Sequence, residues 1–599
     1  MAESAKFSRR DLLKNATVAT AAAGVSSLAA ATSASAQAEP APAAWNRDAD
    51  VVVIGGGAMG LPAAIAAKEA GASVILVEAE PHLGGHAATS GGNVVLGGGT
   101  AAQKKAGIAD SRDSYFRDLT DWSVVEPNGF PDYRYNDREV VRAFVDHSPL
   151  AYDWLMAHGV VFVDKAPDSF DGVSSGNSAP RVMHAAAMNW TDVWTGKPLD
   201  ADIREVTAIG AGVTGPLEAA AKKAGVEILL EHRMTKIYRE HPAGGRVRGI
   251  AVNYKGQKLN IRAHKAIIVG TGGSTGNINF RRMFDPRLTE EYCCLAGMPW
   301  SNQDASGELA AMAIGASLSG LYNQTGEFGS NISKPGFVGC QYNYLPMVQL
   351  IESWNPGSAV FDKARATGLR VMNWQDVILV NMLGERFYDE TSGGFTANDV
   401  DSIKPYTQYS YLNAKNIKYS PNNYLNAALA GIGDGHNGGG PIWAIFDADA
   451  VAREKWDPKL PHVDPEHGFF FTANTLGELA SAIKMRYQRV PMPPQKLMET
   501  VARYNSFVDS GVDEDFGKPK PLYKIAKPPF YAAWATPAVH DTRAGLRIND
   551  KSQVVDLDGE IIAGLYCGGE SAGGFSQHGL ARAIVQGLIA AKNAIDEKV

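Results

Sequence analysis

Two short segments near the C-terminus carry histidine and arginine side chains that could handle protons or bind anions. His540 and Arg543 stand three residues apart, and His578 and Arg582 stand four residues apart. A histidine can polarise a carbonyl or carboxylate group, and an arginine adds positive charge. The four-residue spacing places His578 and Arg582 on one face if a helix begins near His578. A satisfied structural histidine at 540, and a helix-surface or cofactor contact at Arg582, are the alternatives.

The elements that must position these groups begin with a glycine-rich turn. It follows residues 50–54, an apolar run typical of a buried parallel strand, and precedes an Ala-rich helical pattern and a second apolar strand. Glycines here allow a tight turn, close approach of a pyrophosphate, and packing of helix on strand, and the helix N-terminus offers N–H groups. The second strand ends on Glu78, which can accept hydrogen bonds from a ribose hydroxyl. We therefore assign dinucleotide binding to Glu78 and to the turn residues Gly55, Gly57, Ala58, Met59 and Gly60. A glycine-rich turn of another α/β fold is the alternative.

Further landmarks repeat this pattern of close backbone approach. A second glycine-rich loop occupies residues 84–92, and a Thr-Gly-Gly turn follows another apolar strand. Near the C-terminus an acid ends a strand, and a helical pattern over residues 580–593 can point its N-terminal N–H groups at a ligand. The residues of these landmarks that the family resemblance given in the next paragraph assigns to the cofactor are Gly85, His86, Ser90, Gly91, Gly92, Thr271, Gly272, Gly273, Glu570, Leu580 and Ala581.

Together these landmarks resemble the flavoprotein superfamily of fumarate reductases, succinate dehydrogenase flavoproteins and 3-ketosteroid Δ1-dehydrogenases. The likeness runs from residues 81–93 to residues 564–570, and the spacing of the second glycine loop looks most like that of the ketosteroid dehydrogenases. The resemblance implies FAD as the cofactor, with Glu570 on its ribityl chain and the last helix at its pyrimidine. Succinate dehydrogenases attach flavin covalently to a histidine of this loop. His86 stands one residue closer to the glycine pair than theirs, and a polar contact beside the isoalloxazine is the other interpretation.

The resemblance also implies a domain organisation. We expect an α/β fold in which a Rossmann-like FAD-binding domain, residues 45–321 and 538–599, is interrupted by an inserted α+β capping domain at residues 322–537. Segments at 378–387 and 441–447 resemble parts of the family's capping domain. A cap over the flavin edge makes a dry site at a domain interface, where substrates commonly bind.

In this superfamily a hydride moves between flavin N5 and one carbon, while a protein group handles the proton on the neighbouring carbon. The arginine that fumarate reductases use for that proton is absent from residues 388–395. Tyrosines follow instead, and the use of tyrosines by ketosteroid dehydrogenases makes Tyr409 and Tyr411 candidates for base and carbonyl polariser. A packed cap surface is the alternative. His540 matches the substrate-positioning histidine of the fumarate reductases. Arg582 stands in a shorter loop than their carboxylate-binding arginine. The predicted catalytic set is Tyr409, Tyr411, His540, Arg543, His578 and Arg582, with Tyr115 as a weaker candidate.

These features favour FAD-dependent dehydrogenation of a carbon–carbon bond next to a carbonyl, in a ketosteroid-like or other cyclic or enoate substrate. The first alternative is a periplasmic enoate reductase of the fumarate or urocanate kind, fed by an external cytochrome. An alternative of another class is a flavin redox carrier with no substrate of its own. A cap and polar groups argue against the carrier, because a carrier should expose its flavin edge.

Composition and the N-terminus define the expected partners. The 599 residues have a net charge of -7, without the basic excess typical of nucleic-acid binding. The four cysteines form no CxxC or CxxCH motif, so we expect no thiolate metal site and no c-type haem. An external quinone, cytochrome or oxygen must then exchange the electrons.

Residues 1–36, with Arg9 and Arg10 before an Ala-rich run, resemble a twin-arginine export signal, and residues 37–44 form a linker. This predicts export to the periplasm by the twin-arginine machinery; an ordinary basic N-terminus is the alternative.

Overall fold

The computed structural model describes residues 41–88, 90–120, 136–169, 178–186, 210–241, 244–284, 288–294, 302–320, 330–333, 335–340, 368–387, 389–391, 440–460, 462–536, 538–575, 577 and 579–598. The predicted export signal, Tyr409, Tyr411 and His578 lie outside these residues. None of the described helices combines the length and apolarity that crossing a bilayer requires.

Among the described residues, the largest sheet has eight strands. They are β1 (Arg47–Ile54), β2 (Val74–Val77), β5 (Glu227–Leu229), β6 (His232–His241), β7 (Gly244–Tyr254), β8 (Gln257–Val269), β20 (Gln553–Val555) and β21 (Ile561–Cys567). The order is β20-β21-β8-β1-β2-β5, with β7 beside β8 and β6 beside β7. The strands β21, β8, β1, β2 and β5 pair in parallel. The apolar run at the end of β1 is fully buried, as its composition predicts for a central parallel strand.

The register of this sheet brings the predicted cofactor landmarks to one edge. Ile54 at the end of β1 pairs with Val77 on β2 and with Val269 on β8, and Val269 pairs with Cys567 on β21. The residues that follow these strand ends are the first glycine turn, Glu78, the Thr-Gly-Gly turn and the segment of Glu570. The carboxyl edge of an open parallel sheet is the general place for ligands in such folds.

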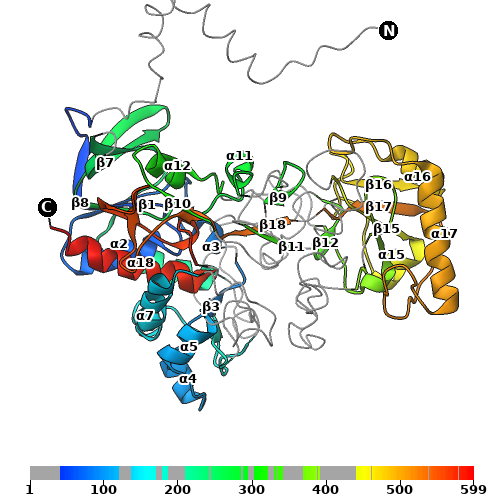
Figure 1. Ribbon diagram of the computed structural model, residues 1–599, viewed down its shortest axis with the longest axis horizontal. Coiled ribbons are helices and arrows are strands. Elements are labelled where there is room, and N and C mark those ends of the chain that lie inside the picture. Colours follow the sequence, from blue (N-terminus) through cyan, green and yellow to red (C-terminus); the bar gives the residue numbers. More distant parts are fainter. Residues whose placement is uncertain are drawn as a thin grey trace, which may run out of the picture.

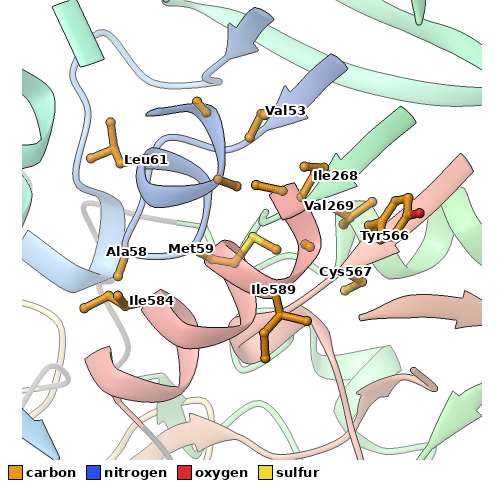
Figure 2. Close-up of a cluster of buried hydrophobic side chains, with 14 of the residues drawn as sticks. Val53, Ala58, Met59, Leu61, Ile268, Val269, Tyr566, Cys567, Ile584 and Ile589 are labelled. Carbon is orange, nitrogen blue, oxygen red and sulfur yellow. The ribbon is translucent and has the colours of Figure 1, made fainter. Parts of the chain in front are cut away.

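Helices pack against the large sheet. Four of them contribute buried residues to the apolar core around it: α2 (Gly60–Glu69), α7 (Arg138–Ala157), α10 (Ala211–Ala224) and α18 (Leu580–Ile595). Figure 2 shows Ala58 and Met59 of the turn beside Ile584 and Ile589 of α18, with Cys567 of β21 close by. The last helix of the chain therefore packs on the first glycine turn, more than 500 residues away in sequence.

A second sheet lies across the molecule from α2 and α18 (Figure 1). It contains β14 (Ile378–Val380), β15 (Trp443–Asp447), β17 (Phe530–Trp534) and β16 (Phe470–Ala473), all antiparallel in that order. Alternate residues enter two apolar clusters: Ala444 and Phe446 enter one, and Trp443 and Ile445 the other. Both faces are therefore buried. The helices of this unit are α15 (Ala448–Glu454), α16 (Leu476–Ala482) and α17 (Pro494–Ser510).

Short strands and helices connect the two large sheets. Three two-stranded sheets pair β3 (Asn93–Val95) with β4 (Val182–His184), β10 (Leu318–Ser319) with β19 (Gly545–Leu546), and β12 (Phe337–Val338) with β13 (Leu369–Arg370). A three-stranded sheet has β18 (Ala538–Thr542) between β11 (Ser330–Ser333) and β9 (Cys293–Cys294). The short helices are α3 (Gly85–Ala88), α4 (Ala101–Lys105), α5 (Arg112–Asp118), α11 (Ile278–Arg281), α12 (Ser306–Met312), η5 (Trp374–Asp376) and η9 (Gly569–Ser571).

Candidate active site

The first glycine turn has room for a ligand at one position and none at the others. A Cβ added at Gly55, where φ is 95°, would lie 2.3 Å from the carbonyl oxygen of Gly270. One added at Gly60 would lie 1.8 Å from the carbonyl oxygen of Gly55. At Gly57 the nearest atom to an added Cβ is the carbonyl oxygen of Gly84, 3.8 Å away. The space in front of Gly57 fits the approach of a pyrophosphate to bare backbone.

Glu78 lies beside this turn with its carboxylate held by backbone donors. Its Oε2 accepts a hydrogen bond from the N–H of Gly56 at 2.7 Å, and its Oε1 accepts one from the N–H of Glu80 at 3.0 Å. Burial raises the pKa of Glu78 against the opposing effect of these donors. A carboxyl group fixed in this way can accept a ribose hydroxyl, as its position after β2 predicts.

The second glycine loop packs against the first. The N–H of Gly84 donates to the carbonyl oxygen of Gly56 at 2.9 Å. Gly85, with φ 49°, has open space where a Cβ would stand. The hydroxyl of Ser90 donates to the carbonyl oxygen of Ala87 at 2.8 Å, and the partly exposed Gly91 and the buried Gly92 follow it. The loop thus adds bare backbone at the same edge as Gly57.

His86 and Glu570 meet across this edge. The Nδ1 of His86 lies 3.3 Å from Oε2 of Glu570, which also accepts a hydrogen bond from Nε2 of Gln303 at 2.9 Å. The other oxygen of Glu570 accepts one from the N–H of Thr542 at 3.2 Å. The carboxylate of Glu570 therefore links the second glycine loop, the segment before α12, and β18.

The Thr271–Gly272–Gly273 turn joins the same cluster. Thr271 Oγ1 lies 3.2 Å from the hydroxyl of Ser571, which donates to the carbonyl oxygen of Gly272 at 2.7 Å. The N–H of Gly273 donates to Oε1 of Gln303 at 2.8 Å. Gln303 is a central member of this site that the sequence did not reveal, because a single glutamine in a polar stretch carries no motif.

α18 begins where the sequence pattern predicts, at Leu580. Gly579 is its N-cap, with a positive φ of 88° that favours glycine and lies outside the helical region. The four-residue spacing puts His578 and Arg582 on one helical face only if the helix begins by His578; the described helix begins at Leu580, and His578 lies outside the described residues. No side chain caps the helix, and a Cβ at Gly579 would meet open space. The N–H groups of Leu580 and Ala581 can then serve a ligand.

The structure places Arg582, Arg543 and His540 in different environments. The buried guanidinium of Arg582 donates to the carbonyl oxygens of Gln577, at 3.3 Å, and of Ala572. These contacts hold its own loop and favour a structural role over substrate binding. Arg543 is buried directly after β18. β18 carries His540 two residues before Thr542, whose N–H reaches Glu570.

Tyr115 is buried in an ionic cluster and supports the loop before α18. Its hydroxyl accepts a hydrogen bond from Nε2 of Gln577 at 2.7 Å and lies 3.4 Å from the carbonyl oxygen of Val95. The guanidinium of Arg181 lies 4.1 Å above its ring and is paired with Asp110 and Asp118. Burial raises the pKa of Tyr115 above its usual value of 10. The neutral phenol is thus a poor base and a good structural partner.

Tyr115→Phe should therefore destabilise the fold without removing a proton-transfer group. The change leaves a buried amide without its 2.7 Å partner, which costs about 1–3 kcal/mol. Urea unfolding of the FAD-loaded protein measures the loss. Tyr152→Phe on α7 is the control, because the Tyr152 ring stacks on Phe162 and no described residue hydrogen-bonds its hydroxyl. Equal stabilities for the two variants would contradict this role of Tyr115.

The predicted catalytic residues are therefore only partly brought together. Glu570, His86 and β18 with His540 lie at one edge with the glycine turns, while Tyr409, Tyr411 and His578 lie outside the described residues. Within the described part of the chain, no group of three or more His, Cys, Asp or Glu side chains is arranged to hold a metal ion.

The glycine turns, Glu78 and Glu570 at the carboxyl edge of a parallel sheet define a dinucleotide-binding oxidoreductase. A family model described as FAD binding domain matches residues 50–583, and the chain belongs to this family. The open backbone at Gly57, Gly85 and Gly579 fits the cofactor. The predicted family, FAD as the cofactor, and the assignment as an FAD-dependent oxidoreductase are thereby confirmed.

Relatives and solved structures agree with this assignment. The chain is 26% identical over 592 residues to a 3-oxosteroid 1-dehydrogenase of Mycobacterium tuberculosis, covering 87% of this chain and 92% of the relative. It is 28% identical over 527 residues to a fumarate reductase (cytochrome) of Shewanella frigidimarina, covering 88% of this chain and 72% of the relative. The structure matches an open flavocytochrome c3 fumarate reductase with a TM-score of 0.61 at 23% identity, covering 92% of this chain and 79% of that one. It matches a 3-ketosteroid delta1-dehydrogenase from Sterolibacterium denitrificans with a TM-score of 0.61 at 20% identity, covering 92% and 100%. The expected α/β FAD-binding fold is thus shared with both.

Proposed function

We propose that this enzyme dehydrogenates a carbon–carbon bond next to a carbonyl group, in a ketosteroid-like or other cyclic ketone. One observation carries the proposal: the alignment spans 92% of a 3-oxosteroid 1-dehydrogenase, against 72% of the cytochrome-containing fumarate reductase. The absence of an arginine at residues 388–395 argues in the same direction.

FAD, when bound, accepts the hydride that leaves the β-carbon of the substrate. The protein must polarise the carbonyl group and remove the proton from the α-carbon. β18 is tied to Glu570 through the N–H of Thr542, so its residue His540 is the candidate polariser. Tyr411 or Tyr409 is the candidate base, a role that rests on the resemblance to the ketosteroid dehydrogenases.

We also propose the domain division that the sequence leads us to expect. The large sheet draws its strands from residues 47–269 and 553–567, and the second sheet draws its strands from residues 378–534. We assign residues 45–321 and 538–599 to the FAD-binding domain and residues 322–537 to a capping domain that covers the flavin edge. An apolar cap would exclude water from the reacting carbons.

The partner and location follow from the N-terminus and the cofactor. The twin-arginine pattern in residues 1–36 supports export of the folded, FAD-loaded enzyme to the periplasm. An external quinone, cytochrome or oxygen would then take the electrons from the reduced enzyme.

An anaerobic flavin spectrum tests the proposal. Saturated 3-ketosteroids and other cyclic ketones should bleach the oxidised-flavin band of the purified enzyme. His540→Ala and Tyr411→Phe should keep FAD bound but slow this bleaching by about 100-fold or more, the size of a general acid–base contribution. His264→Ala is the control, because His264 pairs at the surface of β8 with Asp48.

Two outcomes would overturn parts of the proposal. Unchanged rates in both variants would remove His540 and Tyr411 from the mechanism. No bleaching by any ketone, together with reoxidation of the reduced enzyme by fumarate or urocanate, would establish the enoate reductase instead. His540 and the similarity to a fumarate reductase favour that second candidate.

A further inference from the structure

Gln303 keeps an unfavourable backbone conformation in the middle of the cofactor site. Its φ is 45°, and that of Ala305 is 58°, so two residues with side chains adopt the left-handed region within one short turn. L-residues with a Cβ are disfavoured there. The side chain of Gln303 is nevertheless buried, at 4% exposure. Such a combination points to a use for the side chain itself.

The amide of Gln303 bridges two elements that the cofactor site needs. Its Oε1 accepts the N–H of Gly273 at 2.8 Å, and its Nε2 donates to Oε2 of Glu570 at 2.9 Å. The amide oxygen therefore faces a hydrogen-bond donor, and the amide nitrogen faces an acceptor. A Cβ at Gly272 would lie 3.1 Å from this Nε2, so a glycine there lets the amide come close.

Glu570 also has a second carboxyl group among its neighbours. The neighbouring Glu308 is fully buried, and both its carboxyl oxygens lack a hydrogen-bond partner among the described residues. Burial raises the pKa of Glu308, and the charges of Asp304 and Glu570 add to this. A neutral donor such as Gln303 can orient Glu570 without another charge.

We propose that Gln303 is a positioning residue for FAD, whose amide fixes the carboxylate of Glu570 against the Thr271–Gly273 turn in the place where the ribityl chain binds. The inference rests on the placement of the ribityl chain at Glu570, and not on the identity of the substrate. Through the N–H of Thr542 and Nδ1 of His86, the same carboxylate also links the FAD site to β18 and to the second glycine loop.

Gln303→Gly separates the effect of the side chain from the effect of the backbone conformation. Glycine adopts a φ of 45° without strain, so the turn keeps its conformation while the amide is lost. FAD titration of the apoprotein, followed by flavin fluorescence, should give a dissociation constant about 10- to 100-fold higher, since a hydrogen bond to a charged group is lost. Gln303→Asn, whose shorter amide cannot bridge both partners, should also weaken binding.

Ala305→Gly is the matched control. Ala305 stands in the same turn with φ 58°, so the change relieves the backbone equally but removes no polar contact. Its FAD affinity should stay within about twofold of the wild type, as expected for a site without such a contact. Equal affinities for Gln303→Gly and Ala305→Gly would overturn the inference.

Glu570→Ala tests separately whether Glu570 itself holds FAD. Both Glu570→Ala and Gln303→Gly should weaken FAD binding, and the double variant should be little weaker than Glu570→Ala because both act through one carboxylate. If only Glu570→Ala weakens binding, Glu570 holds FAD without help from Gln303. If Glu570→Ala binds FAD normally, both the ribityl placement and the role of Gln303 are wrong.

Discussion

Gly57→Ala should leave the protein folded and remove most of its affinity for FAD. The backbone at Gly57 has no positive φ, and the nearest atom to an added Cβ is 3.8 Å away. The apoprotein therefore accommodates a methyl group. A cofactor bound at this turn would not, because a pyrophosphate at such a turn needs bare backbone. We expect the dissociation constant for FAD to rise ~100-fold or more, equivalent to about 3 kcal/mol.

Two other glycines frame this result. Gly477→Ala in α16 is the control, since its Cβ would lie 3.5 Å from Sδ of Met498, and it should leave FAD affinity unchanged without lowering stability. Gly60→Ala should damage the fold itself, because its Cβ would lie 1.8 Å from the carbonyl oxygen of Gly55. FAD titration and urea unfolding of each apoprotein give both quantities. Normal FAD affinity in Gly57→Ala would mean that the phosphates do not lie at this turn.

The first glycine turn was predictable because its determinants are local. An apolar strand, three glycines at fixed spacing, a helix and an acid after the next strand each have a mechanical reason within residues 50–78. The register of the parallel sheet then brings the other landmarks to the same edge. The two segments that the sequence singled out in the second unit, residues 378–387 and 441–447, contain β14 and β15, whereas no pattern singled out β16 and β17.

The contacts between distant segments could not be predicted from spacing. Gln303 acquires its importance only from the positions of Gly273 and Glu570. The shared face of His578 and Arg582 was conditional on a helix that begins by His578, and the described helix begins at Leu580. The buried pair of Arg386 and Glu390 likewise has further partners, Asp513 and Lys518, from beyond residue 500.

These buried charges hold the second unit together. Arg386 donates to both oxygens of Glu390, at 2.9 and 2.8 Å, and to Asp513 at 2.9 Å. Nζ of Lys518 lies 3.3 Å from Glu390 and donates to the carbonyl oxygens of Trp374 and Val377. Two cations thus face two carboxylates, which ties the segment after β14 to the segment after α17.

Glu390→Gln should destabilise this unit by about 3–5 kcal/mol, because it leaves buried cations without their compensating charge. Glu390 is fully buried, so solvent cannot replace it. Urea unfolding followed by tryptophan fluorescence reports on the unit through Trp374, Trp443 and Trp534. Glu385→Gln is the control, since the pair of Glu385 with Lys496 is exposed and worth at most about 1 kcal/mol.

The pH dependence supplies an independent measure of the same charge. Burial alone would raise the pKa of Glu390, but Arg386 and Lys518 outweigh it and hold the pKa at about 2, against 4.5 for an ordinary glutamate. Because the folded pKa is the lower one, the stabilisation is complete above about pH 4.5 and is lost as the pH falls towards 2. The stability curves of wild type and Glu390→Gln should therefore converge over this range.

A second substitution tests whether the stability lost in Glu390→Gln comes from the missing charge or from altered packing. Adding Lys518→Met to Glu390→Gln removes a cation that the first change leaves uncompensated, so it should recover part of the lost stability. If the lost contacts were mainly packing, the second change would cost further stability, because Lys518 is buried and donates to two carbonyl oxygens. Recovery in the double variant, with none for Lys518→Met alone, would identify charge balance as the force that joins these segments.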